Sequence, residues 1–69
     1  MSVMNGKPVK SITTAGERGS FIPATDKRTM IVENEYHGTY DLDWVVVIEN
    51  AVEVERFNML HLERVEWLT

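Results

Sequence analysis

The residue types best suited to binding a ligand gather in one polar loop, residues 13–20, which reads Thr-Thr-Ala-Gly-Glu-Arg-Gly-Ser. Glycines let backbone amides converge on one point, and hydroxyl groups and an arginine can hold phosphate oxygens. A pair of basic residues at the other end of the same long loop is expected to close on the same ligand. The predicted phosphate site consists of Arg18, Gly19, Ser20, Lys27 and Arg28. The loop lacks the Gly-Lys-Ser/Thr core of a P-loop, and turn-forming composition alone is the alternative explanation.

A second candidate site is an interface around the two tryptophans, Trp44 and Trp67. They would anchor a protein partner if they face solvent, because binding hot spots favour aromatic side chains. The alternative is that they fill the core. Glu53 and Glu55 are expected to share one strand face and to form an acidic stripe with glutamates of a neighbouring strand. Such a stripe could imitate the charge of DNA, or it could be a solvated sheet face that discourages edge pairing.

The sequence contains no pattern that indicates catalysis or metal binding. His61 could act as an acid–base group, but without a cysteine or a recognisable serine nucleophile it has nothing to activate. His37 could pair with Asp41, and Tyr36 and Tyr40 beside it could stack on a base or sugar, although strand-end positions also explain them. With two distant histidines and no cysteine, a structural zinc site is not expected. We therefore predict a non-enzymatic protein without a metal or cofactor.

The shortness of the chain favours self-association. Its 69 residues allow one domain, residues 1–69, of which 1–7 are expected to be flexible. A domain of this size buries only about 60% of its unfolded surface, and without cysteines a homo-oligomer is a natural stabiliser. No segment approaches the roughly 18 apolar residues of a membrane span, and the N-terminus lacks the apolar core of a signal peptide. We therefore expect a soluble cytoplasmic protein that contacts no membrane.

Charge is distributed unevenly along the chain. Residues 1–28 contain five Lys and Arg against two Asp and Glu, a net charge of +3. Residues 29–69 contain two Arg against nine Asp and Glu, a net charge of −7, so the whole chain carries −4. This asymmetry suggests an electrostatic partner, although net charge alone also serves solubility. Direct binding of DNA or RNA is not expected.

Alternation of apolar and polar residues predicts five β-strands. Residues 8–14 are rich in β-branched residues, and residues 28–36 alternate so that Met30 and Val32 share one face. Residues 44–49 are apolar on both faces, which predicts a central strand or a face that meets a partner. A turn at Asn50 and Ala51 then leads into a fourth strand.

One tight turn is expected before the last strand. Asn58 is a good N-cap, and residues 58–61 fit a single turn of 3₁₀ helix. A last strand follows, in which Val65 and Trp67 alternate with polar residues. A single helix over residues 57–68 is the alternative, but its apolar residues would lie all round the helix instead of on one stripe.

Five short strands, a long first loop and a 3₁₀ turn before the last strand resemble the layout of small SH3-like and Sm-like barrels. The resemblance covers most of the chain and implies a mainly β protein built as a five-stranded antiparallel barrel. The sequence motifs of the two families are absent, so the resemblance does not extend to proline-peptide or RNA binding.

Size, acidity and the run Val-Glu-Val-Glu-Arg-Phe-Asn are similar to those of small bacteriophage-encoded proteins, many of which block host defences. This resemblance implies a counter-defence protein in the host cytoplasm. The first hypothesis is an oligomer that sequesters a phosphate-bearing small ligand such as a signalling nucleotide. The second is an acidic inhibitor that covers a basic surface of a host nuclease or other host factor, and the third is a structural phage subunit without a ligand.

Overall fold

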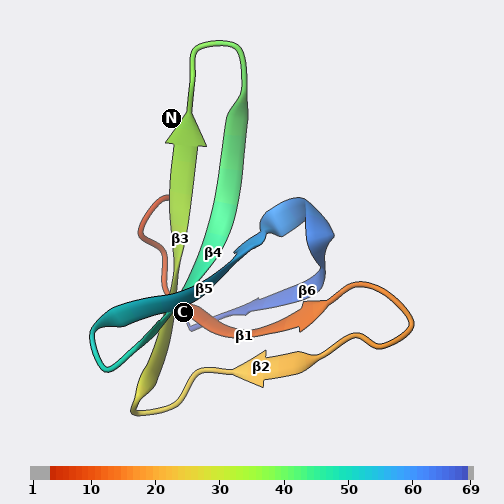
Figure 1. Cartoon of the computed structure of the whole chain (residues 1–69), viewed down its shortest axis with the longest axis vertical. Helices are drawn as coiled ribbons and strands as arrows, with labels where there is room; N and C mark the ends of the chain where they lie inside the picture. Colours follow the sequence, from red (N-terminus) through yellow and green to blue (C-terminus); the bar gives the residue numbers. More distant parts are fainter. Residues whose placement is uncertain (1–3, 69) are drawn as a thin grey trace.

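The computed structural model describes residues 4–68, which form six β-strands and one short 3₁₀ helix. The strands build two three-stranded antiparallel sheets, with the orders β2–β1–β6 and β3–β4–β5 (Figure 1). The elements are β1 (Val9–Thr14), β2 (Phe21–Pro23), β3 (Arg28–Tyr36), β4 (Asp41–Glu49), β5 (Val52–Asn58), η1 (Met59–His61) and β6 (Leu62–Trp67). No helix among these residues has the length and apolar composition that crossing a membrane requires.

The core lies between the two sheets and follows from strand alternation. Because successive side chains point to opposite faces, one face of each strand supplies the apolar residues. Met30 lies opposite Val47 and Val32 lies opposite Val45, so β3 and β4 present matched residues to the interior. From the other sheet, β1 contributes side chains to the same cluster. The buried members are Val9, Ile12, Met30, Val32, Val45 and Val47.

The mainly β fold class is confirmed, but the predicted five-stranded closed barrel is wrong in two respects. The described chain has a sixth strand, because Phe21–Pro23 inside the long loop pairs with β1. The two sheets also stay separate instead of closing into one barrel. Three residues that include a proline carry too little alternation to be recognised as a strand, and this is why β2 was missed.

The turn before the last strand is confirmed. Asn58 caps η1, since its side-chain oxygen accepts a hydrogen bond from the Leu60 amide at 2.9 Å. The β4–β5 turn also lies where it was predicted. Asn50 and Ala51 both have positive φ, 54° and 65°, as a two-residue hairpin turn of type I′ requires. Alanine therefore occupies a position that usually favours glycine.

A β-bulge in β5 changes the direction of its side chains. Glu55 lies opposite Val47 but Glu53 lies opposite Ile48, so Val54 is an extra residue. Glu53 and Glu55 therefore lie on opposite faces of the sheet. The prediction that they share a strand face is wrong, because strict alternation holds only where no residue is inserted into the ladder.

Residues 5–7 run along the outer edge of β3. The Gly6 amide donates to the Val32 carbonyl at 2.6 Å, and the Val32 amide donates to the Lys7 carbonyl at 3.1 Å. The side chain of Asn5 accepts a hydrogen bond from the Asn34 amide at 2.9 Å. The prediction that residues 1–7 are flexible also covers residues 1–3, which lie outside the described part of the chain.

Candidate functional site

The candidate site is a groove of about 460 Å³ between the β2–β1–β6 sheet and the edge strand β5. Its polar lining comes from Thr14, Ser20, Glu55 and His61. Its apolar lining comes from Ala15, Ile22 and Phe57. The volume falls within the range typical of small-molecule sites, about 300–1,000 Å³, and the combination of apolar walls with a few polar groups is also typical.

Three elements bring these side chains together. The β1–β2 hairpin contributes the hydroxyl groups, and the bulge in β5 turns Glu55 toward the same side as the core residue Val47. The 3₁₀ turn places His61 at the end of the groove, where its carbonyl accepts a hydrogen bond from the Ala15 amide at 3.0 Å. The groove therefore offers two aromatic rings, a carboxylate and two hydroxyls to a ligand.

Only part of the predicted phosphate site borders this groove. Ser20 lines it, and Arg18 and Gly19 precede Ser20 in the same exposed loop. The loop amides, however, are already used within the loop. The Gly19 amide donates to the Gly16 carbonyl at 3.1 Å, and the Ser20 amide donates to the Thr14 hydroxyl at 2.7 Å. Both amides therefore already have partners within the chain and do not converge on a phosphate in this structure.

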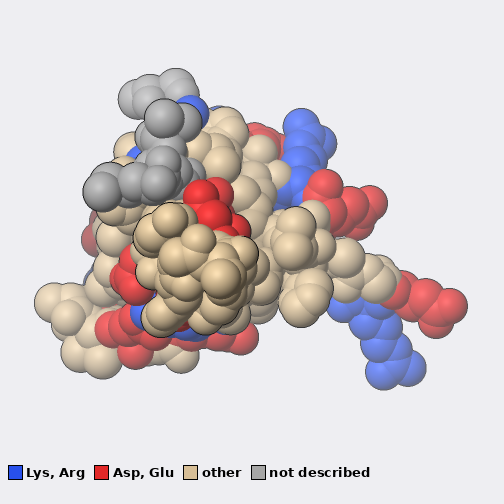
Figure 2. Space-filling view, turned by 90° about the horizontal axis from the view of Figure 1, so that it is seen from above, with Lys and Arg blue, Asp and Glu red and all other residues tan. Residues whose placement is uncertain are grey.

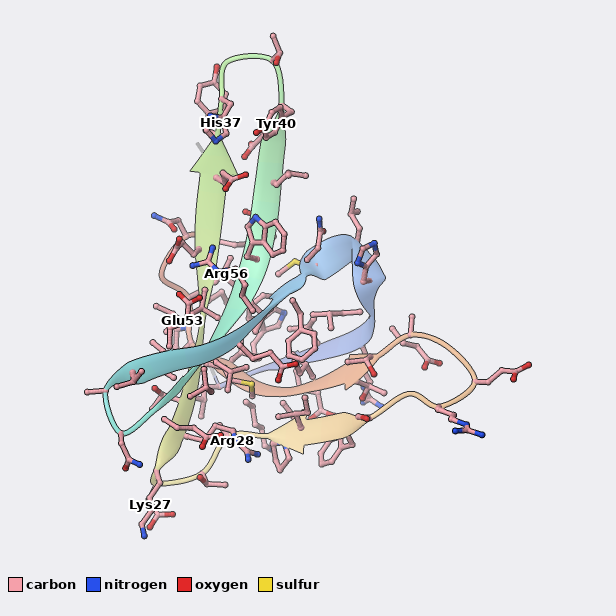
Figure 3. All side chains as sticks on the ribbon, in the orientation of Figure 1. Lys27, Arg28, His37, Tyr40, Glu53 and Arg56 are labelled. Carbon is pink, nitrogen blue, oxygen red and sulfur yellow. The ribbon has the colours of Figure 1, made fainter. Side chains whose placement is uncertain are left out.

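The structure separates Lys27 and Arg28 from the glycine-containing end of the loop. Strand β2 lies between, and Figure 3 places both residues beyond the end of β2 that leads into β3. The Arg28 guanidinium donates to Glu49 at 3.1 Å and to the Pro23 carbonyl at 3.3 Å. The expected closure of the two cations on one ligand with Arg18 is therefore absent within a single chain. Arg28 instead ties β3 to β4, and Lys27 is exposed.

The two tryptophans occupy different environments. Trp67 is partly buried and packs against the core, and the Lys7 ammonium lies 4.4 Å from its ring centroid. Trp44 lies opposite Glu33 and Asn58, on the outer face of the β3–β4–β5 sheet, which is the face turned away from the core. Within the described chain its buried indole N–H has no hydrogen-bond partner. Trp67 thus follows the core-filling alternative, and Trp44 alone lies on an outer face.

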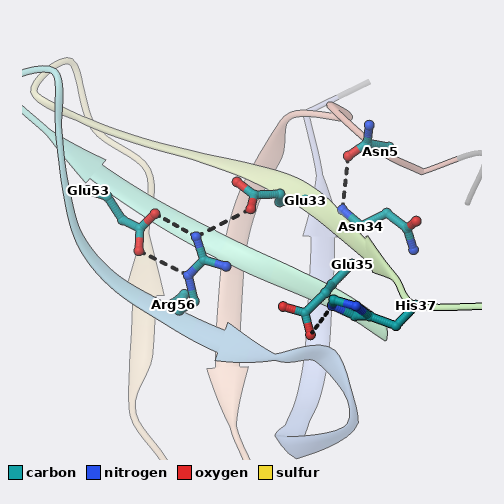
Figure 4. A network of polar contacts seen from close by, with 7 residues as sticks. All are labelled: Asn5, Glu33, Asn34, Glu35, His37, Glu53 and Arg56. Atoms are coloured by element: carbon teal, nitrogen blue, oxygen red, sulfur yellow. Dashed lines mark hydrogen bonds and ion pairs between the residues drawn. The ribbon is translucent and has the colours of Figure 1, made fainter. Parts of the chain in front are cut away.

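A cation interrupts the predicted acidic stripe. Arg56 lies on the outer face of the β3–β4–β5 sheet and donates two hydrogen bonds to Glu53, at 2.7 and 3.0 Å (Figure 4). It also reaches Glu33 on β3 at 3.4 Å, and its guanidinium carbon lies 5.9 Å from the Trp44 ring centroid. The bulge makes this arrangement possible, because it places residues 53 and 56 on the same face. The single positive charge of Arg56 therefore offsets one of the two carboxylates, and the outer face is less acidic than the predicted stripe.

The contacts with Arg56 lower the pKa of Glu53. The hydrogen bond from Arg56 lowers the pKa of Glu53 below its usual 4.5, and the same contact raises the pKa of Arg56. Because the folded-state pKa of Glu53 is depressed, the interaction stabilises the fold at pH values above the unfolded-state pKa. That contribution is lost as the pH falls through the lowered folded-state pKa.

The downward shift of the Glu53 pKa can be tested by replacing Arg56. In Arg56→Gln we expect the pKa of Glu53 to rise toward its usual value, since the charged donor is gone. The measurement is a titration of the Glu53 carboxyl carbon by NMR. Arg64→Gln, which removes an exposed guanidinium on β6, is the control and should leave the Glu53 titration unchanged. An unaltered Glu53 titration in Arg56→Gln would show that the pair does not form in solution.

The histidines lie apart from each other. His37 does not pair with Asp41 as considered from the sequence. Its Nε2 lies 3.7 Å from a Glu35 carboxylate oxygen, and its ring centroid lies 5.0 Å from that of Tyr40. His61 is in the groove, where it serves as lining. Among residues 4–68 no group of three or more His, Asp and Glu side chains is placed to hold a metal ion.

Comparisons of the chain with protein-family models, with curated proteins and with solved structures give no match. The fold and groove define a small two-sheet β-domain with a concave candidate site between the sheets. Thr14 belongs to the loop that the sequence singled out, whereas Phe57 was not predicted as a groove residue. Phe57 could have been found from its position just before the predicted 3₁₀ turn, because this turn leads the end of β5 toward the β1–β2 hairpin.

Proposed function

We propose that this protein is a non-enzymatic binding protein that holds a small nucleotide in the groove between its two sheets. The observation that carries the proposal is the composition of the groove, in which Phe57 and His61 rings lie with a Glu55 carboxylate and two hydroxyls. Aromatic rings stack on nucleobases. A carboxylate accepts hydrogen bonds from the exocyclic amine of a base, and hydroxyls hydrogen bond to a ribose or base edge.

The phosphate end of the ligand is assigned to the loop that borders the groove. Ser20 lines the groove and Arg18 lies two residues earlier in the same exposed loop. A phosphate beside Arg18 would also be kept away from the Glu55 carboxylate, which repels it. The proposal retains Arg18 and Ser20 from the predicted phosphate site and leaves out Arg28, whose guanidinium is engaged by Glu49.

Sequestration requires binding and slow release but no catalytic group, which suits this chain. We retain as part of the proposal the counter-defence role that the resemblance to small phage proteins implies. A second copy would cover the open side of the groove and enclose a ligand that one small domain leaves exposed. Assembly through the flanking edges is opposed by Pro23 on β2 and by the bulge in β5, since both discourage strand pairing.

The proposal predicts a stabilising nucleotide whose affinity depends on Arg18. We expect one class in a panel of cyclic and linear nucleotides to raise the melting temperature. Arg18→Ala should weaken its binding about tenfold, the usual effect of losing a charge-assisted hydrogen bond. Calorimetric titration measures the affinity, and light scattering on the same sample measures the oligomer mass.

Lys27→Ala is the matched control, because it removes the same charge from the opposite end of β2. It should leave the affinity unchanged, whereas His61→Ala, inside the groove, should weaken binding. The proposal is wrong if no nucleotide in the panel stabilises the protein. It is also wrong if Lys27→Ala weakens binding as much as Arg18→Ala, which would indicate general attraction between charges.

A further inference from the structure

The β3–β4 hairpin extends beyond the two sheets and ends in exposed aromatic side chains. In Figure 1 its upper end rises away from the other strands, and residues 36–41 are all exposed. Tyr36 is 60% exposed and Tyr40 is 46% exposed, although large aromatic side chains normally seek burial. The His37 and Tyr40 rings pack together at the tip (Figure 3). The tip is therefore an aromatic surface that the described chain leaves uncovered.

The same hairpin is strongly acidic. Residues 33–43 contain four Asp and Glu and no Lys or Arg. Figure 2 looks down on this end of the molecule and shows acidic side chains bordering the uncharged surface nearest the viewer. The Asn34 side-chain amide donates to the carboxylates of both Asp41 and Asp43, which holds the two carboxylates close together. Such a site favours cations and repels phosphates.

A small pocket of about 160 Å³ lies beside these carboxylates, between the hairpin and η1. Asp41 and Asp43 line it with Asn58, and the apolar part of its wall comes from Leu42, Met59 and Leu60. Leu60 is 81% exposed. Lysine and arginine combine an aliphatic stem with a charged head, so a pocket with apolar walls and a carboxylate rim matches their shape and charge. None of its lining residues is shared with the nucleotide groove.

We propose that this end of the hairpin is a docking site for a basic segment of another protein. One Lys or Arg side chain enters the pocket, where its stem contacts Met59 and Leu60 and its head pairs with Asp41. A neighbouring basic side chain lies on the exposed tyrosine rings, because aromatic faces attract cations. Asp41 differs from Glu53, which pairs with Arg56, because no described Lys or Arg forms an ion pair with Asp41.

The test is amide mapping by ¹⁵N NMR with a blocked hexapeptide that alternates arginine and leucine. We expect shifts confined to the amides of residues 36–43 and 58–60, and no shifts with a peptide in which glutamate replaces arginine. Asp41→Asn keeps the acceptor for Asn34 but removes the charge, and it should weaken peptide binding about tenfold. Glu63→Gln, which removes one exposed carboxylate from β6, should weaken binding less than about threefold.

Four results would overturn the inference. Shifts spread over the whole acidic surface, or equal weakening by Asp41→Asn and Glu63→Gln, would indicate unspecific attraction. Absence of shifts at millimolar peptide would show that the pocket does not bind a basic side chain. Shifts of the same amides on raising the protein concentration without peptide would show that a second copy of the chain occupies the surface instead.

Discussion

Ile12→Ala is expected to lower the melting temperature by roughly 10–25 °C, which follows from a loss of about 2–4 kcal/mol in a domain of this size. Ile12 is 1% exposed and belongs to the core cluster. It lies on β1, the central strand of its sheet, opposite Ile22 and Val65. Truncation therefore leaves a cavity at the point where three strands and the opposing sheet meet. Thermal unfolding followed by circular dichroism measures the change.

Ile48→Ala is the matched control, because it removes the same atoms from a partly buried side chain on the outer face of the β3–β4–β5 sheet. We expect it to cost less than half as much, since less apolar surface is returned to water. Similar losses in the two variants would contradict the assignment of the core to the space between the sheets.

The parts of the fold that could be predicted are those encoded by regular alternation and by local capping. Met30 and Val32, two residues apart on one face of the strand, are buried as expected. Asn58 caps the 3₁₀ turn because its side chain satisfies an amide within two residues. Such local signals do not depend on which strands later pair, so they can be read from the sequence directly.

The parts that could not be predicted depend on contacts between distant segments. Strand β2 exists because β1 supplies a partner for three residues that would otherwise be loop. The bulge at Val54 is likewise invisible to a pattern that alternates perfectly from Val52 to Glu55. Missing it reversed the expected direction of Glu53 relative to Glu55 and concealed the pair between Glu53 and Arg56.

The candidate site was predictable only in part for the same reason. Loop composition pointed to a segment that borders the groove, since Ser20 lines it. It could not show that β2 separates Lys27 and Arg28 from that segment, or that Glu49 engages Arg28. Residues on β5 and η1 complete the groove from a distant part of the sequence.

Gly19→Ala is expected to destabilise the protein by about 1–3 kcal/mol, the usual cost of inserting a methyl group into a closely packed place. A Cβ at residue 19 would overlap the carbonyl oxygen of Thr14. That carbonyl belongs to the backbone of β1, which pairs with β6, so it cannot move aside as a flexible side chain could. Urea denaturation measures the change in the free energy of unfolding.

Glu17→Ala, in the same exposed loop, is the control and should change the free energy by less than about 0.5 kcal/mol. An equal effect of the two variants would mean that the loop relaxes freely and that Gly19 is not packed against β1.

The structure gives Gly19 a different role from the phosphate contact that the sequence suggested. Glycine here permits a close approach of the loop to Thr14, which sets the hydrogen bonds from Thr14 to Ser20 and from Ser20 to Thr14. Gly19 thereby holds Ser20 in the wall of the groove.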